Sequence, residues 1–178
     1  MKAPYYLLFG SEERESFCEN IGFIGQQLDL FLSENGIGSC SLGASKPQDS
    51  KPKEALSLPY VIAMSFGKPA EPLHRSLSEF KRKSLTTISE GDDERLEAAR
   101  LAPSAMNSQN WYFVADNGKI HCYRKKPNLM IGFMLNKMNQ VDMGIAICHI
   151  ARESEAFRFE KVENATVRKG YIYAGTVL

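Results

Sequence analysis

Two unbroken apolar runs in the first half of the chain predict strands. Residues 5–9 are apolar and rich in aromatic side chains, and the run ends at Gly10. Residues 58–66 form the second run, which ends at Gly67. Short apolar runs bounded by glycine are typical of buried strands. We therefore expect both segments to be buried, with the second in the centre of a sheet.

Between these runs the apolar residues follow a helical period. Over residues 18–34 they recur at positions that share one helix face: Ile21, Ile24, Leu28, Phe31 and Leu32. The pattern predicts a helix that ends at Asn35-Gly36. Ser11 is expected to cap its start, because the acidic residues that follow Ser11 would meet the positive end of the helix dipole. Gly22 and Gly25 lie nearly on the same face, which predicts close packing against another helix.

The second half of the chain predicts short elements and one long apolar helix. Residues 94–101 form a short amphipathic segment that Pro103 ends. Asn117-Gly118 lies between two apolar runs and predicts a hairpin. Residues 141–151 are apolar on nearly every side, which implies a helix buried all round. Asp142 is costly in such a helix, so we expect it to cap or pair across an interface.

The remaining segments set the domain organisation. Residues 70–93 are polar, basic first and acidic later, and they predict a linker between half-units at about residues 1–90 and 91–178 of a single domain. Residues 158–178 alternate loosely and predict a terminal strand. Helices and strands are interspersed, with a hairpin, so the predicted fold class is α+β.

Composition excludes several classes of protein. The 178 residues carry 22 Lys and Arg against 21 Asp and Glu, so the basic excess of a general nucleic-acid binder is missing. No apolar run has the length of a membrane span or a signal-peptide core. The four cysteines are far apart and the histidines share no spacing with carboxylates, so we expect free thiols in a cytoplasmic protein and no metal site.

Two segments carry candidate chemistry. Residues 101–111 hold Ser, Asn, Ser, Gln and Asn between a helix and a strand. These side chains do not ionise, which suits the polar edge and phosphate of a cofactor, although a well-capped turn has the same composition. The basic residues 81–83 would suit a phosphate or a solvated surface. Thiol catalysis by Cys40 or Cys148 has little support, because the neighbouring His149 points away from Cys148 on a helix.

The glycine-rich residues 36–43 match no phosphate or nucleophile motif. Their spacing is not G-x-G-x-x-G, and Leu42 stands where a nucleophile elbow needs glycine. Two interpretations remain open. The segment is either a helix end followed by a strand, or a turn beside a flat ligand, where Gly43 permits close approach.

Residues 98–111, Ala-Ala-Arg-Leu-Ala-Pro-Ser-Ala-Met-Asn-Ser-Gln-Asn-Trp, resemble the A-P-S-x-x-N-x-Q-P-W segment of the flavin-dependent nitroreductase family, with Asn110 in place of Pro. Residues 36–43, 61–69 and 80–85 resemble later parts of that family. In ordinary members the Ser/Asn/Gln segment precedes these parts, whereas here it follows them. This order resembles the branch of the family in which two half-units are fused in one chain and mimic the usual homodimer. Residues 23–30 and 142–149 would then be two copies of the interface helix.

The resemblance implies a nitroreductase fold, a mixed and mostly antiparallel sheet flanked by helices. It further implies that FMN performs the hydride chemistry, with NAD(P)H as reductant, a nitroaromatic or quinone-like acceptor, and no catalytic side chain. Polar flavin contacts would come from Ser104, Asn107 and Gln109, the turn at the ring from Ser41, Leu42 and Gly43, and the phosphate anchor from Arg82 with Lys83.

A second hypothesis is a nitroreductase-like protein that has lost its flavin and acts as a binding or interaction module. Two departures from the family favour it: Asn110 replaces Pro, and the family's amino-terminal basic element, of the R-R-S-x-R type, is expected to be missing. In either case we expect a homodimer, because a chain without that element would leave an apolar face exposed.

Overall fold

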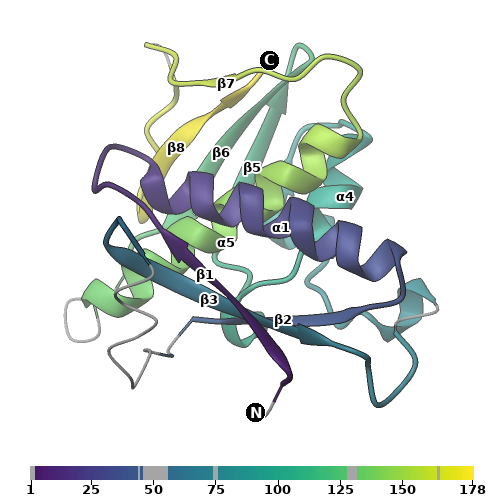
Figure 1. Cartoon of the computed structure of the whole chain (residues 1–178). Coiled ribbons are helices and arrows are strands. Elements are labelled where there is room, and N and C mark those ends of the chain that lie inside the picture. Colours follow the sequence, from purple (N-terminus) through teal and green to yellow (C-terminus); the bar gives the residue numbers. More distant parts are fainter. Residues whose placement is uncertain (1–2, 44, 46–55, 74–75, 128–131, 164) are drawn as a thin grey trace.

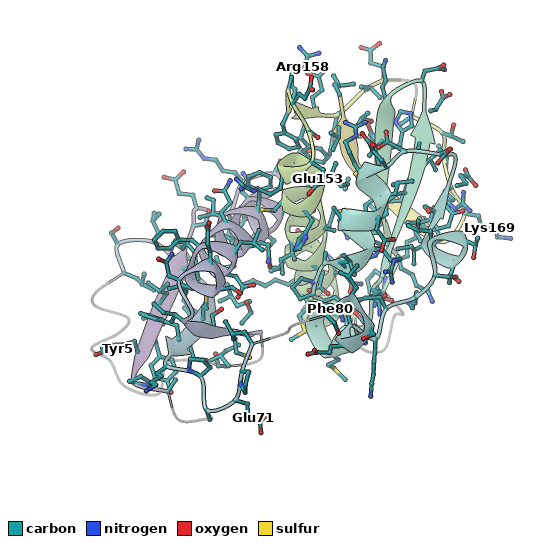
Figure 2. All side chains as sticks on the ribbon, turned by 90° about the vertical axis from the view of Figure 1, so that its right-hand side faces the viewer. Tyr5, Glu71, Phe80, Glu153, Arg158 and Lys169 are labelled. Atoms are coloured by element: carbon teal, nitrogen blue, oxygen red, sulfur yellow. The ribbon has the colours of Figure 1, made fainter. Side chains whose placement is uncertain are left out.

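The computed structural model describes residues 3–43, 45, 56–73, 76–127, 132–163 and 165–178. Two sheets lie on opposite sides of a central pair of helices, α1 and α5 (Figures 1 and 2). Helix α1 contacts strands of the first sheet, and α5 contacts a strand of the second. The fold is α+β with mostly antiparallel strands, as the sequence predicts.

The first sheet is antiparallel, in the order β1 (Tyr5–Gly10), β3 (Tyr60–Gly67) and β2 (Gly38–Leu42). The prediction that β3 is central is confirmed. The prediction that β1 is buried is wrong, because β1 is an edge strand whose Tyr5 is 61% exposed (Figure 2). Tyr5 stacks on Phe66 of β3 at 5.4 Å between ring centroids. An apolar run marks a strand without showing how many neighbours the strand has.

Helix α1 (Phe17–Glu34) has nearly the predicted length, but it begins differently. Ser16, not Ser11, precedes its first turn, in a left-handed conformation and without a capping side-chain bond. The Ser11 hydroxyl donates instead to the carbonyl of Glu12. The apolar face also divides, because Ile21 is buried whereas Phe31 is 60% exposed.

The predicted close packing of α1 against another helix is confirmed. Its partner is α5 (Gly132–Arg152), which is longer than the apolar residues 141–151 suggest and is buried along that apolar stretch. A Cβ atom on Gly22 would lie 2.0 Å from the carbonyl oxygen of Val141, and one on Gly144 would lie 1.9 Å from that of Glu19. The two backbones therefore touch at positions where only glycine fits.

The second sheet has the order β4-β5-β6-β8-β7, and only its β4–β5 pair is parallel. Its strands are β4 (Ser89–Glu90), β5 (Trp111–Asp116), β6 (Lys119–Lys125), β8 (Tyr171–Val177) and β7 (Phe159–Glu160). The predicted hairpin joins β5 to β6, and both Asn117 and Gly118 have positive φ angles, as its tight turn requires. The predicted terminal strand divides into β7 and β8, which pair with each other.

Short helices lie between the later strands. Between β3 of the first sheet and β4 of the second are η1 (Leu77–Glu79) and α3 (Leu85–Ile88). Between β4 and β5 of the second sheet are α4 (Arg95–Leu101) and η2 (Ala105–Asn107). Helix α4 packs on α5 and ends before Pro103, as predicted. The predicted linker, residues 70–93, is partly structured, because η1, α3 and β4 lie within it. Among the described helices, none is long and apolar enough to cross a membrane.

The helix crossing gives a first prediction. Gly144→Ala should lower the free energy of unfolding by about 1–3 kcal/mol, because the new methyl group meets a backbone carbonyl that cannot move without separating the helices. Gly132→Ala is the matched control, since a Cβ atom at Gly132 on the same helix meets nothing within 4 Å. Urea denaturation of both variants measures the difference. Equal stabilities would show that the crossing is not tight.

Candidate functional site

Two segments of the chain meet in one hydrogen-bonded group beside helix α4. The first is residues 81–83 and the second is the loop 104–109. We call the joined side chains the polar cluster: Arg82, Lys83, Ser104, Asn107 and Gln109. These are the residues that the family resemblance singles out as flavin contacts and phosphate anchor, and the structure brings them together.

Arg82 is held by the end of helix α4. Its Nε donates to the carbonyl oxygens of Leu101 and Ala102, both at 3.1 Å. Its Nη1 donates to Oδ1 of Asn107 at 3.0 Å. The carbonyl groups at a helix end carry partial negative charge, so they fix the guanidinium in one orientation. No described residue accepts a hydrogen bond from its other terminal nitrogen, Nη2.

Lys83 is oriented in a similar way by the loop. Its Nζ donates to the carbonyl oxygens of Ser108 at 2.7 Å and Gln109 at 3.1 Å. Within the described chain, neither Lys83 nor Arg82 pairs with a carboxylate. Burial lowers the pKa of both groups, and the nearby charges of Arg100 and Lys125 add to that lowering. The cluster is thus a place where cations gather without an anion.

The loop itself is tied by its own side chains. The Ser104 hydroxyl accepts from the backbone N–H of Gln109 at 2.9 Å, and Nε2 of Gln109 donates to Oδ1 of Asn107 at 3.0 Å. Asn107 also donates to the carbonyl of Lys81 at 2.7 Å. Met106, Asn107 and Gln109 all have φ near +50°. Such conformations cost free energy in residues other than glycine, and functional loops often retain them.

Asp142 of α5 forms a hydrogen bond with the start of the loop 104–109. Its Oδ1 accepts from the N–H of Ala105, the first residue of η2, at 3.0 Å, so Asp142 pairs across an interface, one of the two roles expected of it. Its Oδ2 is buried without a partner among the described residues, and burial raises its pKa to about 7.

His149, two turns further along α5, also has a buried nitrogen, Nε2, without a described partner. Burial lowers the pKa of its imidazole to about 4. The positive charge of Arg82 lowers this pKa further, and the negative charge of Asp29 raises it. Helix α5 therefore presents two incompletely satisfied polar groups along one face.

The predicted ring-contacting residues lie at strand β2 of the first sheet, and their contact with a flavin ring stays a prediction. Ser41 and Leu42 belong to strand β2, where Leu42 lies opposite Ala63 of β3, and Gly43 follows directly. The segment 36–43 is therefore a helix end followed by a strand, one of the two interpretations left open. No hydrogen bond between described residues joins it to the polar cluster. A Cβ atom on Gly43 would lie 3.2 Å from Cε of Met138, so this residue does approach α5 closely.

The thiols do not form a nucleophilic site. Cys148 is buried, and burial raises its pKa to about 11. Reactive cysteines need the opposite shift. Cys40 lies partly exposed on β2, and its Sγ donates to the carbonyl of Ser41 at 3.7 Å. Among the described residues, no three His, Cys, Asp or Glu side chains gather as a metal site would need.

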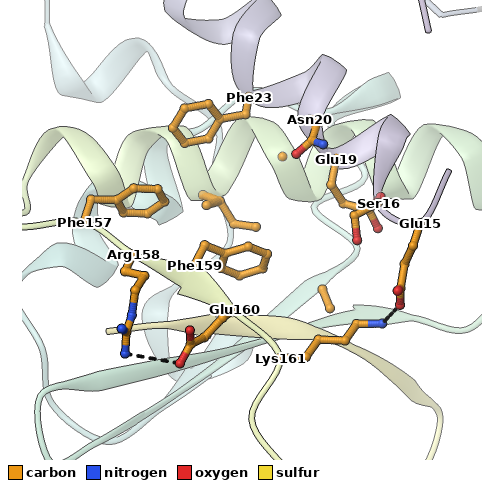
Figure 3. A pocket seen from close by; sticks show the side chains of 13 residues that line it. Glu15, Ser16, Glu19, Asn20, Phe23, Phe157, Arg158, Phe159, Glu160 and Lys161 are labelled. Atoms are coloured by element: carbon orange, nitrogen blue, oxygen red, sulfur yellow. Dashed lines mark hydrogen bonds and ion pairs between the residues drawn. The ribbon is translucent and has the colours of Figure 1, made fainter. Parts of the chain in front are cut away.

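A cavity of about 710 Å³ lies away from the polar cluster, between α1, α5 and the segment before β8 (Figure 3). None of the sequence-predicted site residues lines it. Its aromatic walls come from Phe23, Phe157 and Phe159. Sequence patterns could not indicate this cavity, because residues so far apart in the chain meet only through the helix crossing.

The family model described as "Putative TM nitroreductase" matches residues 1–154. The chain belongs to this family. The crystal structure of a "putative nitroreductase" from Thermotoga maritima aligns with 98% of this chain and 70% of its own, at 23% identity and a TM-score of 0.67. That likeness shows the nitroreductase fold, as the sequence predicts. No curated protein matches the chain.

Arg82 and Lys83 precede the Ser104 loop in this nitroreductase-like chain and bond to it. That the family's amino-terminal basic element, of the R-R-S-x-R type, is missing stays a prediction.

The shifted pKa of Asp142 gives a second prediction. The carboxyl titrates at about 7 in the folded chain, against an ordinary 3.8. Because the folded state holds the proton more tightly, this contribution to stability is full below about pH 4 and is lost as pH rises through about 7. Asp142→Asn keeps an oxygen for Ala105 and should remove roughly 2–3 kcal/mol of the stability loss between about pH 5 and pH 8.

Urea denaturation at the two pH values measures this effect. Asp116→Asn, a change at an exposed position in the β5–β6 hairpin, is the control and should leave the pH dependence unchanged. If Asp142→Asn and the natural chain lose the same stability over that range, Asp142 does not titrate as the structure indicates.

Proposed function

We propose that the chain is an FMN-dependent NAD(P)H oxidoreductase that passes hydride to nitroaromatic or quinone-like acceptors. Membership of the nitroreductase family supports the reaction class. The observation that supports FMN as the cofactor is the polar cluster. There, Arg82 and Lys83 are held by backbone carbonyls and lack a carboxylate partner in the described chain. Oriented cations of this kind are what a phosphate group requires.

The groups around the cluster fit a bound flavin mononucleotide. Nη2 of Arg82 is open for a phosphate oxygen, and an anion there would offset the repulsion between Arg82 and Arg100. The unpartnered Oδ2 of Asp142 and Nε2 of His149 are the kind of buried atoms that a ligand's polar edge satisfies.

In this proposal the side chains bind and orient. FMN, when bound, supplies the hydride-transfer chemistry. Arg82 and Lys83 hold its phosphate, and the amides of Asn107 and Gln109 keep both cations in place through the loop. Asp142 fixes the start of that loop and can hold a proton near neutral pH. No side chain serves as a nucleophile.

The second candidate function is a flavin-less binding module. A specific observation favours it: the side-chain amides of Asn107 and Gln109 already bond to each other and to residues 81–83. If those bonds persist in every state, both amides have fewer groups left for a cofactor. The two candidate functions differ in whether purified protein retains FMN.

Visible absorbance after FMN incubation and gel filtration tests the first function. We expect about one FMN per chain, bleached by NADH or NADPH. Lys83→Met should weaken FMN binding by about ten- to a hundredfold, because a charge-assisted contact to phosphate is lost. Lys161→Met is the matched control, since Lys161 pairs with Glu15 at the aromatic cavity and does not belong to the polar cluster. Absence of retained flavin in the natural chain would favour the binding module.

We also propose that the chain is a homodimer whose two half-units, about 1–90 and 91–178, each contribute one central helix. The outer face of α1 supports a subunit contact, because Ile24 is 49% and Phe31 is 60% exposed while Leu28 lies between them. Contiguous exposed apolar residues of this kind mark interaction surfaces.

Light scattering tests the dimer. Phe31→Glu should raise the dimer dissociation constant by about tenfold or more, because it puts a charge in the middle of an apolar contact. Leu77→Glu is the control, as Leu77 is exposed to a similar degree, 65%, and belongs to η1 instead of α1. A natural chain that scatters as a monomer at high concentration would contradict the proposal.

A further inference from the structure

The cavity between α1 and α5 has the dimensions and walls of a small-molecule site. Its volume of about 710 Å³ lies in the range of known ligand pockets. Phe23 and Phe157 stack at 5.5 Å between ring centroids with 22° between their planes, and the ring of Phe159 faces the same space (Figure 3). The faces and edges that this stacked pair leaves free can contact a flat ring.

Glu19 places one unusual polar group in this apolar space. The residue is only 8% exposed and lines the cavity, yet its Oε2 has no partner in the part of the chain that the structure describes. Burial raises the pKa of its carboxyl. A buried acceptor without a donor is costly. Because the Glu19 carbonyl touches Gly144 at the helix crossing, α1 cannot shift to relieve that cost.

The charges around Glu19 determine which donor it suits. Behind the cavity, Nε of Arg124 lies 3.7 Å from Oε1, and Arg124 does not line the cavity. At the rim, Glu15 pairs with Lys161, and Arg158 pairs with Glu160 at 3.3 Å. The charge of Glu19 is therefore partly balanced already. A neutral N–H donor satisfies Oε2 without placing a second full cation near Arg124.

Two donors stand beside Glu19: Asn20 on the same helix, and Ser16, which precedes the first turn of that helix. Ser16 and Asn20 both line the cavity and are labelled next to Glu19 in Figure 3. A hydroxyl and an amide can donate to a carbonyl oxygen. The site thus offers an acceptor for an N–H and donors for a C=O, close to an aromatic wall.

We propose that this cavity binds a planar aromatic carboxamide, with its ring against Phe23 and Phe157 and its N–H on Oε2 of Glu19. The site shares no residue with the polar cluster, so it does not depend on flavin binding. Its ligand class is defined by a flat ring that carries a neutral amide, and a carboxylate of the same shape is rejected by Glu19.

Calorimetric titration with 1-naphthamide and 1-naphthoate tests the proposal. The two probes share one ring, and only the naphthamide donates an N–H. At about pH 8 naphthoate is ionised, and naphthamide should bind at least about tenfold more tightly. Its N–H donates to Oε2 of Glu19, whereas the naphthoate carboxylate brings only acceptors and a negative charge against that oxygen. Saturating FMN should leave naphthamide affinity unchanged, which separates this site from the proposed flavin site.

Variants assign the selectivity to Glu19 and the ring contact to Phe157. Glu19→Gln keeps the shape and should reduce the preference for naphthamide to about threefold or less, since the charge repulsion is gone. Glu90→Gln, a change far from the cavity lining, should keep the full preference. Phe157→Leu should weaken both probes alike by about three- to tenfold, because one stacking face is lost.

Three results would overturn the proposal: no heat of binding with millimolar naphthamide, equal affinity for the two probes, or an unchanged preference in Glu19→Gln. Circular dichroism of each variant confirms that it is folded before titration. The Phe157→Leu result gives a second, independent check, because that side chain is 38% exposed and its loss leaves the helix crossing intact.

Discussion

The contact between the backbones of α1 and α5 is the constraint on which the rest of the structure depends. Gly22 and Gly144 each face a carbonyl of the opposite helix, with no room for a methyl group. That contact fixes the distance between the two sheets, because each helix packs on one of them. It also fixes what α5 presents to either side: Asp142 toward the loop of the polar cluster, and Gly144 toward the aromatic cavity.

Local chemistry explains which parts of the fold could be predicted from the sequence. The hairpin at Asn117-Gly118, the end of α4 and the glycine contact follow from residues that permit few alternatives. The edge position of β1 and the divided face of α1 depend on partners far away in the chain. The local sequence around Tyr5 or Phe31 therefore could not indicate that these side chains are exposed. Apolar periodicity identifies an element, and tertiary packing decides which of its faces is covered.

The candidate site shows the same division. Ser104, Asn107 and Gln109 form one loop, so their grouping could be predicted, whereas the bonds to residues 81–83 appear only in three dimensions. The segment that ends at Gly43 was ambiguous, and its pairing with β3 decides that it is a strand. The sequence pattern does not mark Glu19 as a functional residue, because an acidic residue in the first turn of a helix is common. Only its burial distinguishes it.

The same helix crossing has a consequence for how the chain folds. It joins residue 22 to residue 141, so its formation requires closing a very long loop, while the β5–β6 hairpin needs only local contacts. Contacts between distant residues form late, since the entropy of loop closure must be lost before they stabilise anything. Until the helices meet, the inner faces of both sheets stay uncovered. The two glycines that allow the tightest packing in the finished molecule therefore also determine when its most aggregation-prone stage of folding ends.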